Sequence, residues 1–368
     1  MKVLYVATVV KTHIMEFHVP YLKMLKEMGW ETAVAARNDY DNPAECVIHY
    51  CDTYYDIPFE RNPFKLGNLK AYKELKRVID DGNYDIIHCH TPVGAMLTRL
   101  AAGDARKKGS KVFYTAHGFH FYKGASLINW LLFYPGEKLL ARKTDVLITI
   151  THEDYKRAQA FKSEAVKYIP GIGVDLRRFK KGSPESTAVL RAELGIPSDA
   201  IVFLSVGEVN KNKNHKVAIQ ALTSFPDCWY VLCGRGPLID EYRKLAESLG
   251  VSDRVIMTGY RTDVVDFYNM ADIFVFPSFR EGLPVALMEA MATGLICVAS
   301  RNRGTDDLLE ESRLLFDAEN RAELVEKLKL ALSSDCSYEV QRNTEHLKVF
   351  DINNTLRLVQ SFYQDAVK

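Results

Sequence analysis

Two glutamates lie on either side of a predicted helix start in the second half of the chain. Glu281 and Glu289 stand in the stretch Phe276–Gly294, which reads FPSFREGLPVALMEAMATG. This stretch predicts a buried strand, a loop and a helix with Pro284 at its first position, where a proline loses no hydrogen bond. Free backbone N–H groups at a helix start can bind a diphosphate, and carboxylates beside them can accept hydrogen bonds from sugar hydroxyls. Taken alone, the spacing is equally typical of two ordinary charged side chains.

Three strand-end histidines are the other groups that could do chemistry. His88 and His90 end one predicted strand, and His117 follows another. The pair His88 and His90 could ligate a metal, but no second cluster at metal-ligand spacing accompanies it. We therefore expect these side chains to line a ligand site and to hold no metal.

Short β-branched runs alternate with helix-period segments along the whole chain, which predicts parallel sheets covered by helices on both faces. The predicted strands are 3–9, 32–36, 86–89, 111–115, 146–150, 165–169, 201–206, 229–233, 254–258, 273–277, 296–299 and 312–316. The predicted helices are 19–28, 68–80, 94–107, 216–222, 238–249, 263–270, 284–293, 321–333 and 352–367. A Gly- and Pro-rich stretch at 170–184 separates two such α/β units, and ligands in doubly wound sheets bind at the carboxyl ends of the strands.

Length and charge exclude several classes of protein. A chain of 368 residues should hold two domains. Its 48 Lys and Arg nearly balance 47 Asp and Glu, unlike the basic excess of a general nucleic-acid binder. No apolar run reaches the roughly 18 residues of a membrane span, and the first residues read as a buried strand rather than a signal peptide. Seven scattered cysteines without a CxxC pair predict reduced thiols in a cytoplasmic protein.

Residues 118–143 form an aromatic-rich apolar segment with basic flanks. They include Trp130 and Phe133, with Lys138, Arg142 and Lys143 close by. This composition suits a membrane interface, although a buried helix and loop would read the same way. A second basic group, Arg99, Arg106, Lys107, Lys108 and Lys111, could face anionic lipid heads or simply end solvated helices.

Five motifs together resemble the retaining glycosyltransferases of family 4. Besides the two glutamates in their EGLP setting, they are Asp85–His90 (DIIHCH), Thr115–Gly118 (TAHG), Cys233–Pro237 (CGRGP) and Gly259–Val264 (GYRTDV). The resemblance implies a GT-B fold, an α/β architecture of two facing doubly wound Rossmann-like domains with a cleft between them. It places an acceptor-binding domain at 1–175, a donor-binding domain at 176–350, and a helix at 351–368 that returns to the first domain.

The resemblance also implies residue roles. His117, Lys213 and Glu281 would be catalytic, with Lys213 on the donor diphosphate and His117 and Glu281 on the donor sugar, while Glu289 would bind the ribose. Further donor contacts are expected from Glu208, Arg235, Tyr260, Arg261, Gly282, Leu283 and Pro284. Glu208 departs from the family, which usually has an arginine there, so Lys211, Arg235 or helix amides would have to compensate. Acceptor or membrane contacts are expected from His18, Phe119, Tyr122, Trp130 and Phe133.

The implied activity is retaining transfer of a hexose or N-acetylhexosamine from a nucleotide-diphosphate sugar, with UDP expected, to a glycan. A polyprenyl-diphosphate-linked intermediate of capsule, exopolysaccharide or O-antigen synthesis is the expected acceptor. The protein would bind peripherally at the inner face of the cytoplasmic membrane, without a cofactor or metal and without nucleic acid. Two alternatives remain open: a UDP-sugar 2-epimerase of the same architecture, and a non-catalytic sugar-nucleotide-binding subunit.

Overall fold

The computed structural model describes residues 1–310 and 312–368. The chain divides into two compact units, of which unit 1 comprises Met1–Ile172 and Asn353–Lys368 and unit 2 comprises Gly173–Ile352. The chain passes from unit 1 to unit 2 after Ile172 and returns to unit 1 after Ile352. Both positions lie within three residues of the boundaries expected from the sequence, 175/176 and 350/351. In the described part of the chain, no helix is both long and apolar enough to cross a membrane.

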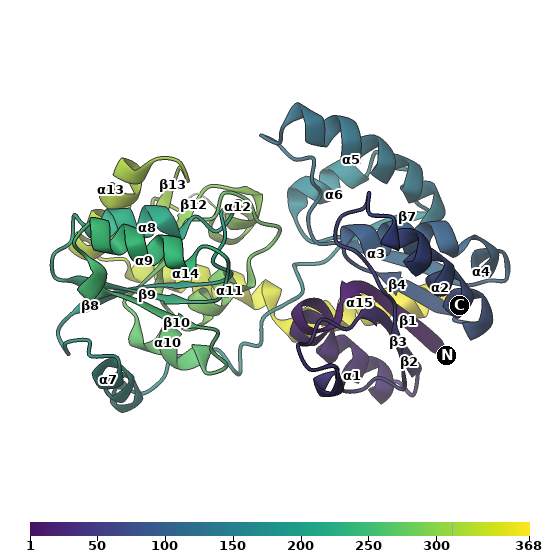
Figure 1. Ribbon diagram of the computed structural model, residues 1–368, viewed down its shortest axis with the longest axis horizontal. Helices are drawn as coiled ribbons and strands as arrows, with labels where there is room; N and C mark the ends of the chain where they lie inside the picture. Colours follow the sequence, from purple (N-terminus) through teal and green to yellow (C-terminus); the bar gives the residue numbers. More distant parts are fainter. Residues whose placement is uncertain (311) are drawn as a thin grey trace. The chain divides into compact units, whose positions relative to one another are not determined.

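Unit 1 is built on a parallel seven-stranded sheet with the order β3-β2-β1-β4-β5-β6-β7 (Figure 1). The strands are β1 (Lys2–Val9), β2 (Glu31–Arg37), β3 (Thr53–Asp56), β4 (Ile86–Cys89), β5 (Lys111–Ala116), β6 (Val146–Thr149) and β7 (Ala165–Tyr168). The sequence pattern misses only β3, since this edge strand is half-buried and has no continuous apolar run. The strand order reverses between β1 and β4, and ligands of doubly wound sheets bind at such a point.

The helices between residues 1 and 172 outnumber the three that the sequence pattern predicts there. They are η1 (Val10–His18), α1 (Val19–Glu27), η2 (Pro43–Glu45), α2 (Gly67–Gly82), α3 (Pro92–Ala101), α4 (Gly103–Lys107), α5 (Leu127–Leu140), η3 (Ala141–Lys143) and α6 (His152–Ala158). The single helix expected over 94–107 is broken at Ala102 into α3 and α4. The first loop of the sequence pattern is η1, a π-helix whose Lys11 N–H donates to Asp39 Oδ1 at 2.6 Å.

The last helix, α15 (Ile352–Ala366), contributes to the core of unit 1. Its Tyr363 is fully buried, and the Tyr363 and Tyr5 hydroxyl oxygens lie 2.7 Å apart. Tyr363 also hydrogen-bonds His88 of β4, whose Nε2 lies 2.8 Å from Thr115 Oγ1 of β5. A buried polar chain therefore joins α15 to three strands, and its groups satisfy one another.

Unit 2 repeats the architecture with a parallel six-stranded sheet of order β10-β9-β8-β11-β12-β13. The strands are β8 (Ile201–Val206), β9 (Cys228–Cys233), β10 (Val255–Gly259), β11 (Ile273–Phe276), β12 (Ile296–Ser300) and β13 (Leu315–Phe316). Its helices are α7 (Pro184–Glu193), α8 (His215–Leu222), α9 (Ile239–Ser248), η4 (Ser252–Arg254), α10 (Val264–Met270), α11 (Val285–Ala292), α12 (Arg303–Leu309), α13 (Arg321–Ser333), α14 (Ser337–Leu347) and η5 (Lys348–Phe350). The predicted pair of doubly wound parallel sheets is thus confirmed, and the strand order of unit 2 reverses between β8 and β11.

The basic group at 99–111 is not the continuous surface that a lipid-facing patch would need. Arg99 is 1% exposed, its Nη1 lies 2.8 Å from Glu137 Oε2, and its guanidinium packs 4.2 Å from the Tyr114 ring centroid. Arg106 donates to both carboxylate oxygens of Asp145. Most residues of α3 are buried, and Arg99 lies among them, where its ion pair with Glu137 holds α5 to the domain core.

Candidate functional site

The loops that follow β8 and β11 are tied together at the point where the strand order of unit 2 reverses. The Phe279 N–H donates to Asn212 O at 2.8 Å, and Asn212 Nδ2 donates to Arg280 O at 2.8 Å. Asn214 Nδ2 extends the link to Ala318 O at 2.9 Å. These bonds fix the backbone of both loops, so side chains that the loops carry are held in place before a ligand binds.

Lys213 and Glu281 form an ion pair between these two loops. Lys213 Nζ lies 2.8 Å from Glu281 Oε1, and the side chains are 21% and 13% exposed. The lysine lies over the Phe276 ring, with Nζ 5.3 Å from the centroid, and its Cε lies 3.6 Å from where a Cβ on Gly207 would stand. A partly open pair of this kind can exchange partners on ligand binding, the ammonium for phosphate oxygens and the carboxylate for sugar hydroxyls.

The α11 start differs from the expected one by a single position. Pro284 is the N-cap, with φ −79° and ψ 112°, and the helix begins at Val285. Within the helix, Glu289 Oε2 accepts a hydrogen bond of 2.8 Å from the Tyr268 hydroxyl of α10. Burial and the neighbouring carboxylate raise the pKa of Tyr268 well above its ordinary value, so the phenol stays a donor. Glu289 is therefore a fixed acceptor rather than a mobile surface charge.

The start of helix α12 packs against the backbone of the EGLP loop, a contact that the sequence motifs do not show. A Cβ on Gly304 would lie 1.9 Å from Gly282 O, so only glycine fits this contact. Arg303 Nε donates to Glu281 O at 3.0 Å, and Asn302 caps the helix through the N–H groups of Gly304 and Thr305. The only sequence signal is the Asn-Arg-Gly-Thr run, which by itself reads as an ordinary helix cap.

The two glycines of the CGRGP motif allow the loops after β8 and β9 to touch backbone to backbone. A Cβ on Gly234 would lie 1.8 Å from Gly207 O, and one on Gly236 would lie 2.2 Å from Val209 O. The exposed Arg235 between them stacks on exposed Tyr260, with Cζ 5.7 Å from the ring centroid. An exposed aromatic ring beside a guanidinium is a surface on which a nucleotide base can stack.

The other expected donor contacts fall into two groups. Gly282 and Leu283 share the EGLP loop with Glu281 and so lie beside the ion pair. Arg261 is engaged in a two-pronged ion pair with Asp263, with Nε 2.8 Å from Oδ1, and Glu208 is exposed on the loop after β8. That Lys211, Arg235 or helix amides compensate for the family arginine at the Glu208 position stays a prediction.

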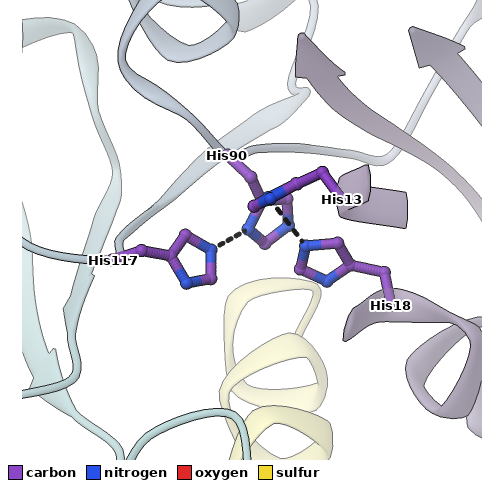
Figure 2. Close-up of side chains that lie close together, drawn as sticks. All are labelled: His13, His18, His90 and His117. Atoms are coloured by element: carbon purple, nitrogen blue, oxygen red, sulfur yellow. Dashed lines mark hydrogen bonds between the residues drawn. The ribbon is translucent and has the colours of Figure 1, made fainter. Parts of the chain in front are cut away.

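In unit 1, His117 belongs to a group of four histidines rather than standing alone at a strand end (Figure 2). Its Nε2 lies 3.2 Å from His90 Nδ1, and His18 Nε2 lies 3.2 Å from His13 Nε2. Burial lowers the pKa of His117 to about 4 and the pKa values of the other three well below their ordinary value. His117 is thus neutral at pH 7 and can exchange hydrogen bonds without carrying a charge.

Two of the residues expected to contact acceptor or membrane are buried in the structure of unit 1. His18 is 2% exposed inside the histidine group, and Phe119 is 3% exposed and stacks on Phe121. Trp130 and Phe133 are half-buried against the core of unit 1, and Tyr122 is half-buried as well. The aromatic side chains of residues 118–143 pack against the core, because large rings bury the most apolar area.

The exposed apolar face of α5 comes instead from its aliphatic residues. Leu127 is 80% exposed and Leu131 is 75% exposed, and Ile128, Leu132 and Leu139 are exposed as well. No residue of α5 is fully buried. A contiguous apolar face of this kind indicates an interaction surface.

An apolar pocket of about 590 Å³ opens between α5 and α3 within unit 1. Leu132, Phe133 and Leu140 of α5 and Met96 of α3 line its apolar part. Its polar lining is provided by Thr8, Thr12, His13, Arg61, Thr91, His120 and Glu137. The backbone of Thr91 has φ +62° and ψ 148°, a strained conformation for a β-branched residue, and such strain concentrates at binding sites. The pocket thus offers an apolar lining and a group of polar side chains to one ligand.

Comparison with known proteins gives matches over both units. Residues 186–346 match the family described as "Glycosyl transferases group 1", and residues 2–151 match the one described as "Glycosyl transferase 4-like". EpsD of Bacillus subtilis (strain 168), which is named as a glycosyltransferase, is 43% identical over 316 residues, or 84% of this chain and 81% of EpsD. The UDP-Gal:alpha-D-GlcNAc-diphosphoundecaprenol alpha-1,3-galactosyltransferase of Escherichia coli is 29% identical over 266 residues, or 68% of this chain and 66% of that protein.

The fold has close structural counterparts. Anabaena HepE in complex with UDP and glucose matches with a TM-score of 0.81 at 19% identity, covering 99% of this chain and 100% of that chain. WaaG, a glycosyltransferase involved in lipopolysaccharide biosynthesis, matches with a TM-score of 0.73 at 17% identity, covering 99% of each chain. The two parallel sheets, the family matches and the EpsD identity lead to the same assignment. The chain belongs to the group 1 glycosyltransferases of family 4, GT-B enzymes that transfer a sugar from a nucleotide sugar.

Proposed function

We propose that this enzyme transfers a hexose or N-acetylhexosamine, with retention, from a UDP-sugar to a polyprenyl-diphosphate-linked glycan during polysaccharide synthesis. The observation that carries the donor half is the ion pair between Lys213 and Glu281, 2.8 Å apart at the strand-order reversal of unit 2. UDP as the donor nucleotide is supported by HepE, solved with UDP, and by the UDP-Gal-dependent relative. Polysaccharide synthesis is supported by the similarity to EpsD.

The donor would replace the internal contacts of this site with its own. Lys213 would leave Glu281 to bind the diphosphate, and the free N–H groups at the start of α11 would share the charge. Glu281 would then accept hydrogen bonds from the sugar hydroxyls, and the fixed Glu289 carboxylate would accept them from the ribose. Stabilising the departing diphosphate favours an oxocarbenium-like transition state, in which the bond from C1 of the sugar to the diphosphate breaks while the acceptor hydroxyl attacks C1 on the same face and passes its proton to the departing phosphate oxygen.

The acceptor half rests on the 590 Å³ pocket of unit 1. Its apolar lining suits a polyprenyl chain, and Arg61 with the three threonines suits a diphosphate. Arg61 Nη2 already donates to Thr12 Oγ1 at 3.3 Å, which orients the guanidinium. The E. coli relative, whose name specifies an undecaprenol-linked diphosphate acceptor, supports the same class of substrate.

The test is a panel of nucleotide sugars incubated with the enzyme and a short polyprenyl-diphosphate sugar, with products identified by mass. We expect one UDP-sugar to give an extended lipid-linked product and UDP release that depends on the acceptor. Release of UDP with an isomerised sugar and no extended product would instead identify a 2-epimerase. No turnover with any donor, despite nucleotide binding, would identify a binding subunit.

Glutamine at both Leu127 and Leu131 is expected to weaken binding to vesicles that contain anionic lipid by about tenfold or more. Each exposed leucine would bury apolar area in the lipid interface, at about 25 cal/mol per Å². Because both side chains project from the protein, the free energy of unfolding should change little. Vesicle sedimentation measures the partitioning.

A matched control replaces two exposed apolar residues of unit 2, Val189 and Leu332, by glutamine. This control should bind vesicles like the parent protein. Equal partitioning of both double variants would show that the α5 face does not contact the membrane.

A further inference from the structure

We propose that His13, His18, His90 and His117 of unit 1 together bind one divalent transition-metal ion, with Zn²⁺ the expected ion. One nitrogen from each ring lies within 4.8 Å of the corresponding nitrogen of every other ring. Figure 2 shows the four rings converging from three separate segments of the chain. The ion would be held in unit 1, whereas Lys213 and Glu281 belong to unit 2, and the group shares with the expected donor contacts only His117.

Two of the distances within the group match the spacing of ligands around a tetrahedral zinc. Two nitrogens bound to one zinc at roughly 2.0–2.1 Å lie about 3.3 Å apart. The His13–His18 and His90–His117 nitrogen pairs are each separated by 3.2 Å. Each pair thus already has the spacing of two ligands, and only a closer approach of one pair to the other would complete the site.

The π-helix η1 is the element that makes the group possible. Its i→i+5 hydrogen-bond pattern places residues five positions apart nearly one above the other, whereas an α-helix would direct them to different faces. His13 and His18 are separated by five positions and lie on η1 (Val10–His18). His90 and His117 follow β4 and β5, which pair in the sheet, so their side chains arrive at the same sheet edge. Such π-helical turns are rare and are frequent at functional sites.

Two ring nitrogens of the four histidines find no hydrogen-bond partner among the described residues. His18 Nδ1 and His90 Nε2 are buried without a hydrogen-bond partner among the described residues, a costly arrangement for a polar atom. A void of about 10 Å³ is bounded by His18, His90 and His117 among other residues, close to the volume that one small occupant needs. His18 Nδ1 and His90 Nε2 are the ring nitrogens outside the two 3.2 Å pairs, so they do not bind the ion in this arrangement, and a water molecule in the void is their expected partner, as is usual for the second nitrogen of a metal-bound histidine.

The ligand chemistry favours zinc, copper or nickel. The group contains only imidazole nitrogens, which suit these ions and do not suit Mg²⁺ or Ca²⁺. Neutral imidazole is the form that binds metal. His13 also lines the 590 Å³ pocket, so a bound ion would add positive charge near the polar side chains of that pocket.

The test is a titration of the full-length, chelator-treated protein with Co²⁺, followed by displacement with Zn²⁺. We expect saturation at one equivalent per chain, the visible absorption of tetrahedral Co²⁺, and its loss when Zn²⁺ is added. Excess Zn²⁺ at about 100 times the dissociation constant should raise the melting temperature of the protein by about 5 °C or more. Absence of binding at one equivalent would overturn the proposal and leave a hydrogen-bonded group with bound water.

Two variants locate the ion. His90→Gln removes a buried ligand and His13→Gln a half-buried one, so the second remains informative if the first fails to fold. Each should weaken Co²⁺ binding by at least about 100-fold, the upper end of what the loss of a second-shell partner costs. His49→Gln, at an exposed histidine outside the group, should bind like the parent protein. Parent-like binding by folded His13→Gln would contradict the assignment, whatever its effect on glycosyl transfer.

Discussion

Alanine at Lys213 or at Glu281 is expected to lower the rate of glycosyl transfer by at least about 10²-fold, the usual effect of removing one preorganised charge-stabilising group. Lys213→Ala removes the ammonium group that would stabilise the leaving diphosphate. Glu281→Ala removes the carboxylate that would accept hydrogen bonds from the donor sugar hydroxyls. The 2.8 Å contact between them means that either change also leaves a partly buried charge without its partner. The two effects should therefore not add in the double variant.

Initial rates at saturating UDP-sugar, together with the KM for the donor, measure this loss. Loss of transition-state stabilisation lowers kcat, whereas loss of uniform binding raises only KM. Asp240→Ala is the matched control, because it breaks an exposed ion pair of similar length, 2.9 Å, with Arg243 in unit 2. Glu281→Gln keeps the size of the side chain and separates the charge from its packing. Near-normal rates in both alanine variants would remove these residues from the catalytic site.

Alanine at Glu137 is expected to destabilise unit 1 by about 3–5 kcal/mol, the range for removing one partner of a buried ion pair. Arg99 is 1% exposed and contacts both oxygens of Glu137, at 2.8 and 3.2 Å. Without that carboxylate, the guanidinium would stay buried beside the Tyr114 ring with its charge uncompensated. Because the pair joins α3 to α5, the same change should loosen the helix that carries the exposed leucines.

Urea unfolding followed by tryptophan fluorescence measures this effect. Two of the three tryptophans, Trp30 and Trp130, lie in unit 1, and Trp130 lies on α5 itself. The double variant Arg99→Met with Glu137→Leu removes both charges and should regain most of the lost free energy of unfolding. An exposed pair such as Arg243 and Asp240 should contribute less than about 1 kcal/mol when broken. A decrease of under about 1 kcal/mol in the free energy of unfolding for Glu137→Ala would mean that the Arg99 guanidinium reaches solvent once its partner is removed.

Strands and their order along the chain follow from the sequence pattern. Buried parallel strands are continuous β-branched runs, so 86–89 and 201–206 are predicted with the bounds that β4 and β8 have. The donor motifs follow as well, because they lie where such strands end and helices begin. What these motifs do on this chain remains a prediction that the rate measurements above address.

Features that depend on partners distant in sequence are not visible in that pattern. The π-helix η1 reads as a loop, since a 3.6-residue period does not fit it. Short polar helices such as α6 and α12 carry too few apolar residues to show a period. Arg99 reads as a surface cation, because its partner Glu137 stands 38 positions away.

By itself, the sequence determined the architecture and the family of this protein. Hydrophobic periodicity is local, and glycosyltransferase motifs are short runs at strand ends, so both can be read along the chain. Only the tertiary structure decided which side chains meet: Lys213 with Glu281, Glu289 with Tyr268, and four histidines from three segments. It also directed the aromatic side of α5 inward and left its leucines exposed. The physical reason is that burial and pairing are set by the packing of distant segments, which no local pattern records.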